Sequence, residues 1–398
     1  MSTAPAKKRY PLAEATIDRQ DIDQLIQWLQ TYPWLTQGRL VNEFEQQWSS
    51  WLGRPYSLFC NSGSSANMLM FYAALLSGRL KNKTVVVPAI SWATTVAPAI
   101  QLGFEPIMCE ADWQTFGLDL DQLEQLCRDH QPSAVIVVHT LGVPGLMDRL
   151  LELREKFGFM LMEDACPATG STFKGQHVGT FGDMASFSFY FGHHLSTIEG
   201  GMVSTDDEAL QDILLHIRSH GWPKDLEPAK EAALAAAHNV LDFNRRFTFY
   251  YPGFNFRSTD LNARIGLSQM AKVDRVVERR IENQSVYERR FTGSEHFHFP
   301  SNEHGVTCSI SFVALAASLE HRDLVGQTLG RYDIETRPLG GGSMSRQPFW
   351  ADRFGSRPFP VADAIHTRSF MLPNNPDLST DDINFICDVV FDVSVPGR

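Results

Sequence analysis

Two neighbouring histidines, His193 and His194, occupy a polar turn between an apolar segment, residues 185–189, and a glycine pair, Gly200 and Gly201. Tandem histidines invite a metal-site interpretation. However, side chains at consecutive positions diverge, and no third ligand stands at helical spacing. We therefore expect no metal here. An imidazole can instead transfer protons near neutral pH.

Two further polar features stand at a helix start or a strand end, where open α/β sheets place their ligands. Residues 61–65, Asn-Ser-Gly-Ser-Ser, open a predicted helix, and their N–H groups would converge on a phosphate seat. A plain serine N-cap is the alternative. Glu163 and Asp164 close the apolar run FMLMED, where an acid binds a cofactor nitrogen or caps the next turn. The residues alone leave both pairs of interpretations open.

Apolar runs alternate with helical patterns around these features, which predicts a mostly parallel sheet covered on both faces. Apolar residues three and four apart also predict short amphipathic helices over residues 20–31 and 42–52. The predicted strands are Val85–Val87, Ala134–Val138, Met160–Met162 and Ala185–Phe189, and the predicted helices among them are Ser62–Leu76, Leu120–Arg128 and Arg149–Lys156.

The length of 398 residues suits a large domain followed by a smaller one. We expect the large domain over residues 1–265 and, over residues 266–398, a linking helix with a small α/β domain. A strongly helical pattern from Leu261 to Thr292 predicts that linking helix. The Ala-rich segment 231–241 is interpreted as a helical insertion.

Composition narrows the class of protein. A net charge of −11 argues against a nucleic-acid surface, which needs a basic stripe. The six cysteines lie far apart without a CxxC pair, so no zinc or iron–sulfur site is expected, and reduced thiols favour the cytoplasm. The first fifteen residues lack the apolar core of a signal peptide, and no apolar stretch is long enough to span a membrane.

Six segments in family order resemble the sugar-modifying DegT/DnrJ/EryC1/StrS family of aminotransferases, which use pyridoxal 5'-phosphate (PLP), from about Tyr10 to the C-terminus. They are Ser-Gly-Ser at 62–64, PAISWATT at 88–95, EDA at 163–165, GTFGDMASFSF at 179–189, TIEGG at 197–201 and PGFNFRSTDLNARIGLSQ at 252–269. The resemblance implies the PLP-dependent aminotransferase fold of type I, an α/β fold with a large, mostly parallel sheet domain and a smaller C-terminal domain.

The same resemblance assigns cofactor contacts by position. It implies that Asp164 pairs with the pyridine nitrogen and that Trp92 stacks on the ring. The phosphate would be bound by Gly63 and Ser64 through N–H groups, by the Ser188 hydroxyl, and by Asn255 from the neighbouring subunit, which implies a homodimer with shared active sites. The structural alternatives are a strand-end cap for Asp164, a core tryptophan for Trp92, a helix cap for Gly63 and Ser64, a strand serine for Ser188 and a turn asparagine for Asn255.

The departure from the family pattern concerns the lysine that binds the cofactor covalently. That lysine stands six residues before the Glu of the Glu-Gly-Gly turn, and counting back from Glu199 reaches His193. The nearest lysines, Lys174 and Lys224, are distant in sequence, and Pro167 replaces a glutamine of many relatives. Histidine can move a proton but cannot release an aminosugar by lysine exchange, so the replacement predicts dehydration at C3 rather than amination.

The histidine-bearing members that this chain resembles work with free pyridoxamine 5'-phosphate (PMP) on the route to 3,6-dideoxy sugars such as colitose. The resemblance implies GDP-4-keto-6-deoxy-D-mannose as the nucleotide-sugar substrate, with L-glutamate regenerating PMP and ammonia released. His193 is expected to be the base, and His220, in the segment Arg218–Trp222, a helper or a mere helix-end cap. His194 would point away, and Arg337 is a candidate for binding a carboxylate.

Three rival interpretations remain. The iron–sulfur 3-dehydrase branch also carries histidine at the lysine position, but its clustered cysteine ligands are missing here. An ordinary sugar-nucleotide aminotransferase would require the lysine. A cofactor-binding relative without catalysis would have no need to keep Asp164 and Ser188.

Overall fold

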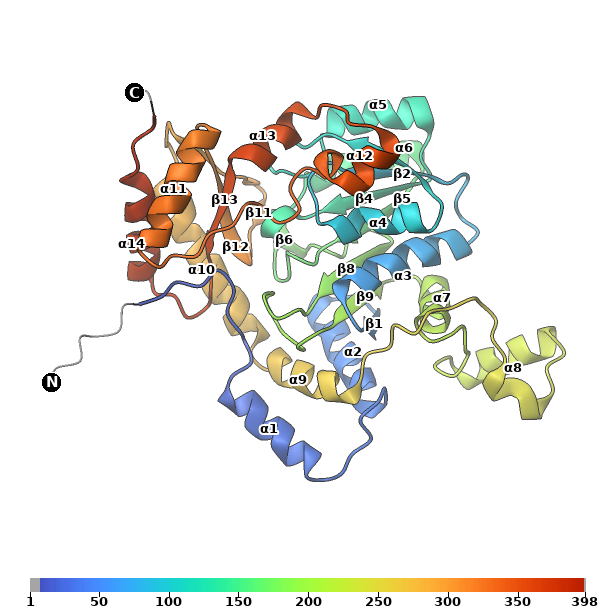
Figure 1. Cartoon of the computed structure of the whole chain (residues 1–398). Helices are drawn as coiled ribbons and strands as arrows, with labels where there is room; N and C mark the ends of the chain where they lie inside the picture. Colours follow the sequence, from blue (N-terminus) through green and yellow to red (C-terminus); the bar gives the residue numbers. More distant parts are fainter. Residues whose placement is uncertain (1–7, 397–398) are drawn as a thin grey trace.

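The computed structural model describes residues 8–396. Residues 1–7, where the segment examined for a signal peptide begins, lie outside the described residues. Two sheets with their covering helices make up most of the molecule (Figure 1).

The large sheet has seven strands in the order β1-β9-β8-β5-β4-β2-β3. They are β1 (Tyr56–Cys60), β2 (Thr84–Pro88), β3 (Glu105–Cys109), β4 (Ala134–Val138), β5 (Met160–Asp164), β8 (Met184–Ser188) and β9 (Gly201–Thr205). Only β9 runs antiparallel to its neighbours, so the predicted mostly parallel sheet is confirmed. The four predicted strands correspond to β2, β4, β5 and β8. Strand β3 has no predicted counterpart because Pro106 breaks its apolar run, and it lies at the sheet edge, where proline is tolerated.

Alternate side chains of one strand enter two different apolar cores. In β4, Ala134 and Ile136 pack in the cluster that contains α3 (Gly63–Leu76) and α4 (Ala93–Gln101). Val135 and Val137 pack in the cluster that contains α5 (Leu120–His130) and α6 (Met147–Phe157). Successive strand residues point to opposite faces, so each face of the sheet has its own core covered by helices. The helices cover the faces, and the strand ends stay free for a site.

The first two helices are α1 (Arg19–Leu29) and α2 (Arg39–Leu52), close to the predicted ranges. The predicted linking helix is wrong in its continuity: α9 (Asp260–Met270) ends two residues before α10 (Val273–Phe291) begins. At the break, the Lys272 amine contacts Asp18 and Asp21 at the start of α1. The turn between the two helices lets α9 pack on α2 while α10 packs against the small sheet.

The small sheet is antiparallel, with β12 (Ser311–Ala316) between β10 (Phe297–His298) and β13 (Ser369–Pro373). Its core is shared with α10, α11 (Leu319–Arg331) and α14 (Thr380–Phe391). Side chains of α12 (Pro348–Phe354) and α13 (Pro360–Arg368) join the core of the large sheet instead. The domain boundary at residue 265 stays a prediction.

The remaining segments are short or peripheral. They are α7 (Glu208–Arg218), α8 (Pro228–Ala237), the 3₁₀ turns η1 (Thr140–Gly142), η2 (Asp242–Phe247) and η3 (Met344–Arg346), and a minor sheet of β6 (Thr172–Phe173), β7 (Gln176–His177) and β11 (Gly305–Val306). Helix α8 matches the predicted insertion and stands on an arm away from the large sheet (Figure 1). Within residues 8–396, no helix is long and apolar enough to cross a membrane.

Candidate active site

The carboxylate of Asp164 is aligned at the end of β5 by three donors. Its Oδ2 accepts hydrogen bonds from Asn67 Nδ2 at 2.9 Å and from Thr95 Oγ1 at 2.6 Å. Its Oδ1 accepts one from the Cys166 N–H at 3.1 Å. Asp164 therefore does cap the following turn, but two buried side chains from α3 and α4 also fix its orientation, which a simple cap does not require.

The neighbouring Glu163 points to the opposite face of the sheet. It is fully buried and accepts N–H donors from Gly179, Phe181 and Gly182, and it contacts His139 Nε2 at 2.9 Å. Burial alone would raise the pKa of Glu163, but its bond and charge interaction with His139 and the backbone donors together lower it. Glu163 is thus the turn-holding acid, and Asp164 is the member of the pair that faces the candidate site.

The predicted phosphate seat divides into a cap and two available donors. Ser62 is the N-cap of α3, and its hydroxyl accepts the Ser65 N–H at 3.1 Å. Gly63 and Ser64 begin the first helical turn, where N–H groups have no carbonyl one turn earlier to bind. The serine-cap interpretation therefore holds for Ser62 and leaves the two predicted phosphate donors available.

Gly63 lies directly against the end of β8. A Cβ atom at Gly63 would stand 2.7 Å from Ser188 Cβ and 3.0 Å from both Ser188 Oγ and Cys166 Sγ. Only glycine fits there, and the close approach brings the start of α3 beside the Ser188 hydroxyl. The structure thus places three predicted phosphate contacts, Gly63, Ser64 and Ser188, at one point.

Trp92 precedes α4 and is 60% exposed, which excludes the core-tryptophan alternative. The glycine-rich loop of the C-terminal region packs beside it, since a Cβ at Gly340 would lie 3.7 Å from the Trp92 ring. The Ser64 hydroxyl also donates to Thr94 Oγ1 at 2.9 Å, two residues after Trp92. The exposed ring therefore borders the same strand-end region as the phosphate seat.

The His193 ring contacts the main chain two residues after Asp164. Its Nδ1 lies 2.8 Å from the main-chain oxygen of Cys166. A carbonyl oxygen only accepts, so Nδ1 carries the proton and the neutral ring keeps its lone pair on Nε2. Burial lowers the pKa of His193, the Cys166 bond and the Asp164 charge raise it, and the Arg280 charge lowers it, with a net decrease. The imidazole is therefore set up to accept a proton at Nε2.

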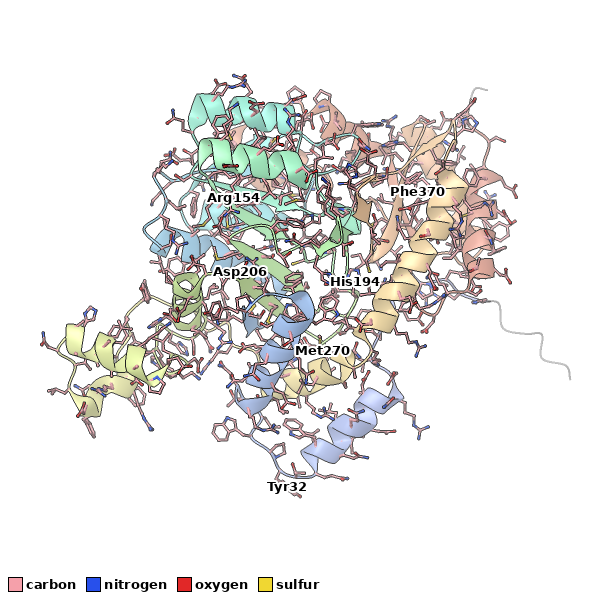
Figure 2. The ribbon with its side chains drawn as sticks, turned by 180° about the vertical axis from the view of Figure 1, so that it is seen from behind. Tyr32, Arg154, His194, Asp206, Met270 and Phe370 are labelled. Atoms are coloured by element: carbon pink, nitrogen blue, oxygen red, sulfur yellow. The ribbon has the colours of Figure 1, made fainter. Side chains whose placement is uncertain are left out.

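His194 points elsewhere, as expected. Its Nε2 contacts the Cys308 carbonyl oxygen at 3.0 Å, and the side chain is fully buried between the large sheet and α10 (Figure 2). Burial holds the pKa of His194 well below its ordinary value. Among residues 8–396, no group of three histidine, cysteine or acidic side chains could hold a metal ion.

His220 belongs to a second cluster with Asn255. Its backbone is left-handed, at φ 60°, and its N–H donates to the Phe254 carbonyl rather than to a carbonyl of α7. Arg257 Nη2 lies 3.4 Å from His220 Nε2, and Arg257 Nε donates to Asn255 Oδ1 at 3.0 Å. The exposed amide of Asn255 is therefore held beside the His220 ring.

The helix-end alternative for His220 holds for its backbone, because a left-handed residue followed by the Gly221 N–H bond to His216 O closes α7, while its ring contacts Arg257. The second cluster adjoins the phosphate seat through the backbone, where the Asn61 N–H donates to Phe256 O at 2.9 Å. Across the described chain, no hydrogen bond or ring contact joins His193 to His220.

Arg337 is not drawn into either cluster. Its guanidinium donates to Glu335 Oε1 at 2.6 Å on an exposed surface, and this bond lowers the pKa of Glu335. The Arg337 guanidinium, predicted to bind a carboxylate, is thus already paired with the carboxylate of Glu335. The assignment of Arg337 stays a prediction.

Sequence reasoning missed four groups that shape the site: Asn67, Thr95, the Cys166 carbonyl and Arg257. Two had a usable signal, because Asn67 follows Gly63 by one helical turn and Thr95 follows Trp92 by three residues. A main-chain carbonyl has no signature in the sequence.

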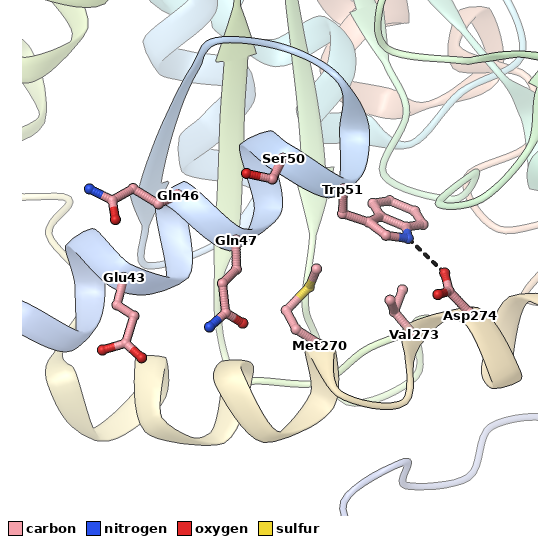
Figure 3. Close-up of a pocket in the computed structure, with 8 residues that line it drawn as sticks. All are labelled: Glu43, Gln46, Gln47, Ser50, Trp51, Met270, Val273 and Asp274. Carbon is pink, nitrogen blue, oxygen red and sulfur yellow. Dashed lines mark hydrogen bonds between the residues drawn. The ribbon is translucent and has the colours of Figure 1, made fainter.

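The open surface cavities lie away from these clusters. One, of about 590 Å³, lies between α2 and the junction of α9 with α10, where Trp51 donates to Asp274 (Figure 3). Another, of about 940 Å³, lies beside Glu45, Arg218 and Asp225. Neither of these two cavities is lined by a predicted cofactor contact.

Comparison with known proteins gives a consistent result. A model of the DegT/DnrJ/EryC1/StrS aminotransferase family matches residues 16–391. The GDP-4-keto-6-deoxy-D-mannose 3-dehydratase of Yersinia pseudotuberculosis is 31% identical over 340 residues, 84% of this chain and 85% of that protein.

Two solved structures are also similar. The E. coli GDP-4-keto-6-deoxy-D-mannose-3-dehydratase with bound hydrated PLP has a TM-score of 0.87 and 28% identity, over 96% of this chain and 99% of that one. A GDP-4-keto-6-deoxymannose-3-dehydratase with a trapped PLP–glutamate geminal diamine has a TM-score of 0.87 and 28% identity, over 96% and 100%. These similarities confirm the predicted fold of type I. The roles of the individual site residues stay predictions.

Proposed function

The chain belongs to the DegT/DnrJ/EryC1/StrS aminotransferase family, and we propose that it is a PLP/PMP-dependent nucleotide-sugar 3-dehydratase. It would convert GDP-4-keto-6-deoxy-D-mannose into GDP-4-keto-3,6-dideoxymannose. L-Glutamate would regenerate PMP, and ammonia would be released. The observation that carries the proposal is His193, a histidine at the lysine position whose Nε2 is free to accept a proton.

The residues present fit the cofactor. The tight approach of Gly63 to Ser188 leaves a cradle of N–H and hydroxyl donors for a phosphate. Asp164 is oriented by Asn67 and Thr95, which leaves its carboxylate suited to a protonated pyridine nitrogen. The exposed Trp92 ring offers an aromatic face for stacking.

The cofactor supplies an electron sink conjugated with the sugar carbon that bears nitrogen. His193 Nε2 would take the proton whose loss starts the elimination, and Cys166 O would hold the neutral ring in the tautomer that carries its proton on Nδ1. His220, held by Arg257, would bind the sugar or assist departure of the C3 hydroxyl. The balance is one sugar oxygen lost, while glutamate becomes 2-oxoglutarate and its nitrogen leaves as ammonia.

A homodimer with shared active sites is part of the proposal. Asn255 is exposed and oriented by Arg257, so it is available to reach the phosphate bound to a second copy. We also retain a cytoplasmic location, which the six free cysteines favour.

A sugar-nucleotide aminotransferase is the second candidate, because the matching family is described as one of aminotransferases. It would need a lysine at the site. The Lys174 amine instead contacts Asp148 on the surface, and Lys224 lies 3.7 Å from Asp225. Neither is bonded to the Asp164–Ser188 region, which weighs against amination and leaves the non-catalytic relative as the remaining alternative.

The test is to supply PMP, L-glutamate and GDP-4-keto-6-deoxy-D-mannose and to measure product mass and ammonia. A sugar nucleotide one oxygen lighter, with stoichiometric ammonia, is expected. A product with nitrogen in place of the keto oxygen would establish an aminotransferase. Tight PMP binding without any product would establish a non-catalytic relative. Omission of glutamate is the control and should limit the reaction to one turnover per bound PMP.

A further inference from the structure

Arg280, on α10, is a buried cation that bonds only to main-chain carbonyls. It is 1% exposed. Its Nη1 donates to Asn374 O at 2.5 Å and Ile310 O at 3.1 Å, with a longer contact to Ser309 O at 3.4 Å. Its Nη2 contacts His193 O at 3.5 Å.

No carboxylate of the described residues compensates this charge. Within the described residues 8–396, Arg280 forms no ion pair, and burial lowers its pKa to about 10, so it remains charged at neutral pH. Burial of an unpaired charge is strongly unfavourable unless dipoles or hydrogen bonds replace the lost water. Its retention behind a candidate catalytic turn therefore calls for a function.

The guanidinium joins three separated chain segments. They are the turn of His193, the residues that precede β12, and the residue that follows β13. Asn374 completes the junction, because its Nδ2 donates to Arg280 O at 3.2 Å and to Ser309 O at 3.0 Å. The His193 turn is thereby tied to the small sheet where β12 begins and β13 ends.

The charged groups that act on the His193 ring are Asp164, at the end of β5, and Arg280, on α10. The other titratable neighbours are uncharged near neutral pH. Burial raises the pKa of the Cys166 thiol well above its usual range and that of the Cys308 thiol to about 12, and it lowers the pKa of His194. The Tyr190 ring lies 6.3 Å from the His193 ring, centre to centre.

Asp164 and Arg280 act on the imidazole in opposite directions. A nearby carboxylate favours the imidazolium ion, whereas a nearby guanidinium disfavours it. Without Arg280, the Asp164 carboxylate that the cofactor requires would also favour protonation of the proposed base. Burial of the imidazole is the largest effect against protonation, and the uncompensated cation adds to it by offsetting part of the Asp164 effect from the other side of the turn.

We propose that Arg280 is a positioning residue for His193: it anchors the His193 turn to the small sheet, and its unpaired charge adds to burial in favouring the neutral, proton-accepting imidazole. This inference rests on the proposed role of His193 as the base. In this inference Arg280, a buried residue of α10, affects the proton transfer only indirectly, through His193.

The first test needs no substrate and no cofactor. The His193 ring is followed by NMR during a pH titration of the cofactor-free protein labelled with ¹³C at histidine, and H193N identifies its signal. The ring is expected to titrate below the ordinary histidine range. Titration at or above that range in the wild-type protein would overturn the inference, whatever the variants do.

The second test separates charge from structure with Arg280→Gln and Arg280→Lys. In Arg280→Gln, the His193 titration and the acidic limb of the kcat/KM profile should both move to higher pH, and kcat should fall about 10–100-fold. Arg280→Lys keeps the charge, so its profile should stay near the wild-type position although kcat is reduced. Equal losses of kcat in both variants, with neither profile displaced, would overturn the charge effect.

Arg279→Gln is the matched control. Arg279 is the adjacent residue, and its guanidinium contacts Leu378 O and Glu282 rather than the His193 turn. Its His193 titration should be unchanged, and a shift as large as that of Arg280→Gln would count against the inference. The NMR result is independent of the reaction catalysed. An aminated product would therefore refute the proposed function without altering what the titration says about Arg280.

Discussion

The Nδ1–H group of His193 donates a hydrogen bond to the main-chain oxygen of Cys166, 2.8 Å away. Cys166 follows Asp164 by two residues, and its own N–H donates to Asp164 Oδ1. One short turn therefore orients both the proposed partner of the cofactor nitrogen and the proposed base. Displacement of this turn would affect both groups together.

Replacement of His193 by asparagine should remove proton transfer while keeping a similar volume. We expect kcat for dehydration to fall about 10²–10⁴-fold, the usual contribution of a general base. PMP affinity should change little, as measured by quenching of protein fluorescence. His298→Asn is the control, at a half-buried histidine that stacks on Trp113 outside both clusters. Unchanged turnover in His193→Asn would transfer the role of base to another group, with His220 the first to test.

The pH dependence should follow the lowered pKa of His193. The base form is present above that pKa and is lost as pH falls through it. We therefore expect the acidic limb of kcat/KM, which reports the free enzyme, below the ordinary value of 6.5, because burial lowers the pKa. His220→Asn should keep this limb if His193 alone is the base. An acidic limb above 6.5 in the wild-type enzyme would contradict the assignment.

Gly63→Ala should weaken cofactor binding because the added Cβ would stand 2.7 Å from Ser188 Cβ. Displacement of the start of α3 would misalign the phosphate donors, and we expect PMP affinity to fall at least about tenfold. Calorimetric titration of PMP provides the measurement. Gly326→Ala, in α11, is the control: its added Cβ would lie 3.9 Å from the nearest atom, and the variant should bind PMP normally. Equal PMP affinity in the two variants would contradict the assignment of the phosphate seat to this position.

Glu163 and Asp164 should separate into a structural and a functional acid. Glu163→Gln disrupts a fully buried carboxylate with three backbone donors and should lower the free energy of unfolding by about 2–4 kcal/mol. Its PMP affinity should stay within about twofold when the protein is folded, since Glu163 faces away from the site.

Asp164→Asn should show the converse pattern, with PMP affinity reduced at least about tenfold because the charge opposite the ring nitrogen is lost. Denaturant unfolding and PMP titration of both variants provide the measurement. The same loss of PMP affinity in Glu163→Gln would show that the two acids cannot be separated in this way.

Much of the frame follows from the sequence because its signals are local. Short, mostly apolar runs marked β2, β4, β5 and β8, and helical periodicity marked α3, α5 and α6. The count of six residues back from Glu199 identified His193 without any structure. Patterns of this kind depend on neighbours in the chain, so sequence alone carries them.

The tertiary structure decided what depends on groups distant in sequence or on the main chain. Residue types do not reveal which His193 nitrogen holds the proton, because a carbonyl 27 positions earlier decides it. The break at Lys272 follows from carboxylates of α1, and the charge behind His193 comes from α10. The sequence by itself therefore determined which residues could do the chemistry. Only the packing of separate elements determined their orientation and protonation, because hydrogen bonds and charges act through space rather than along the chain.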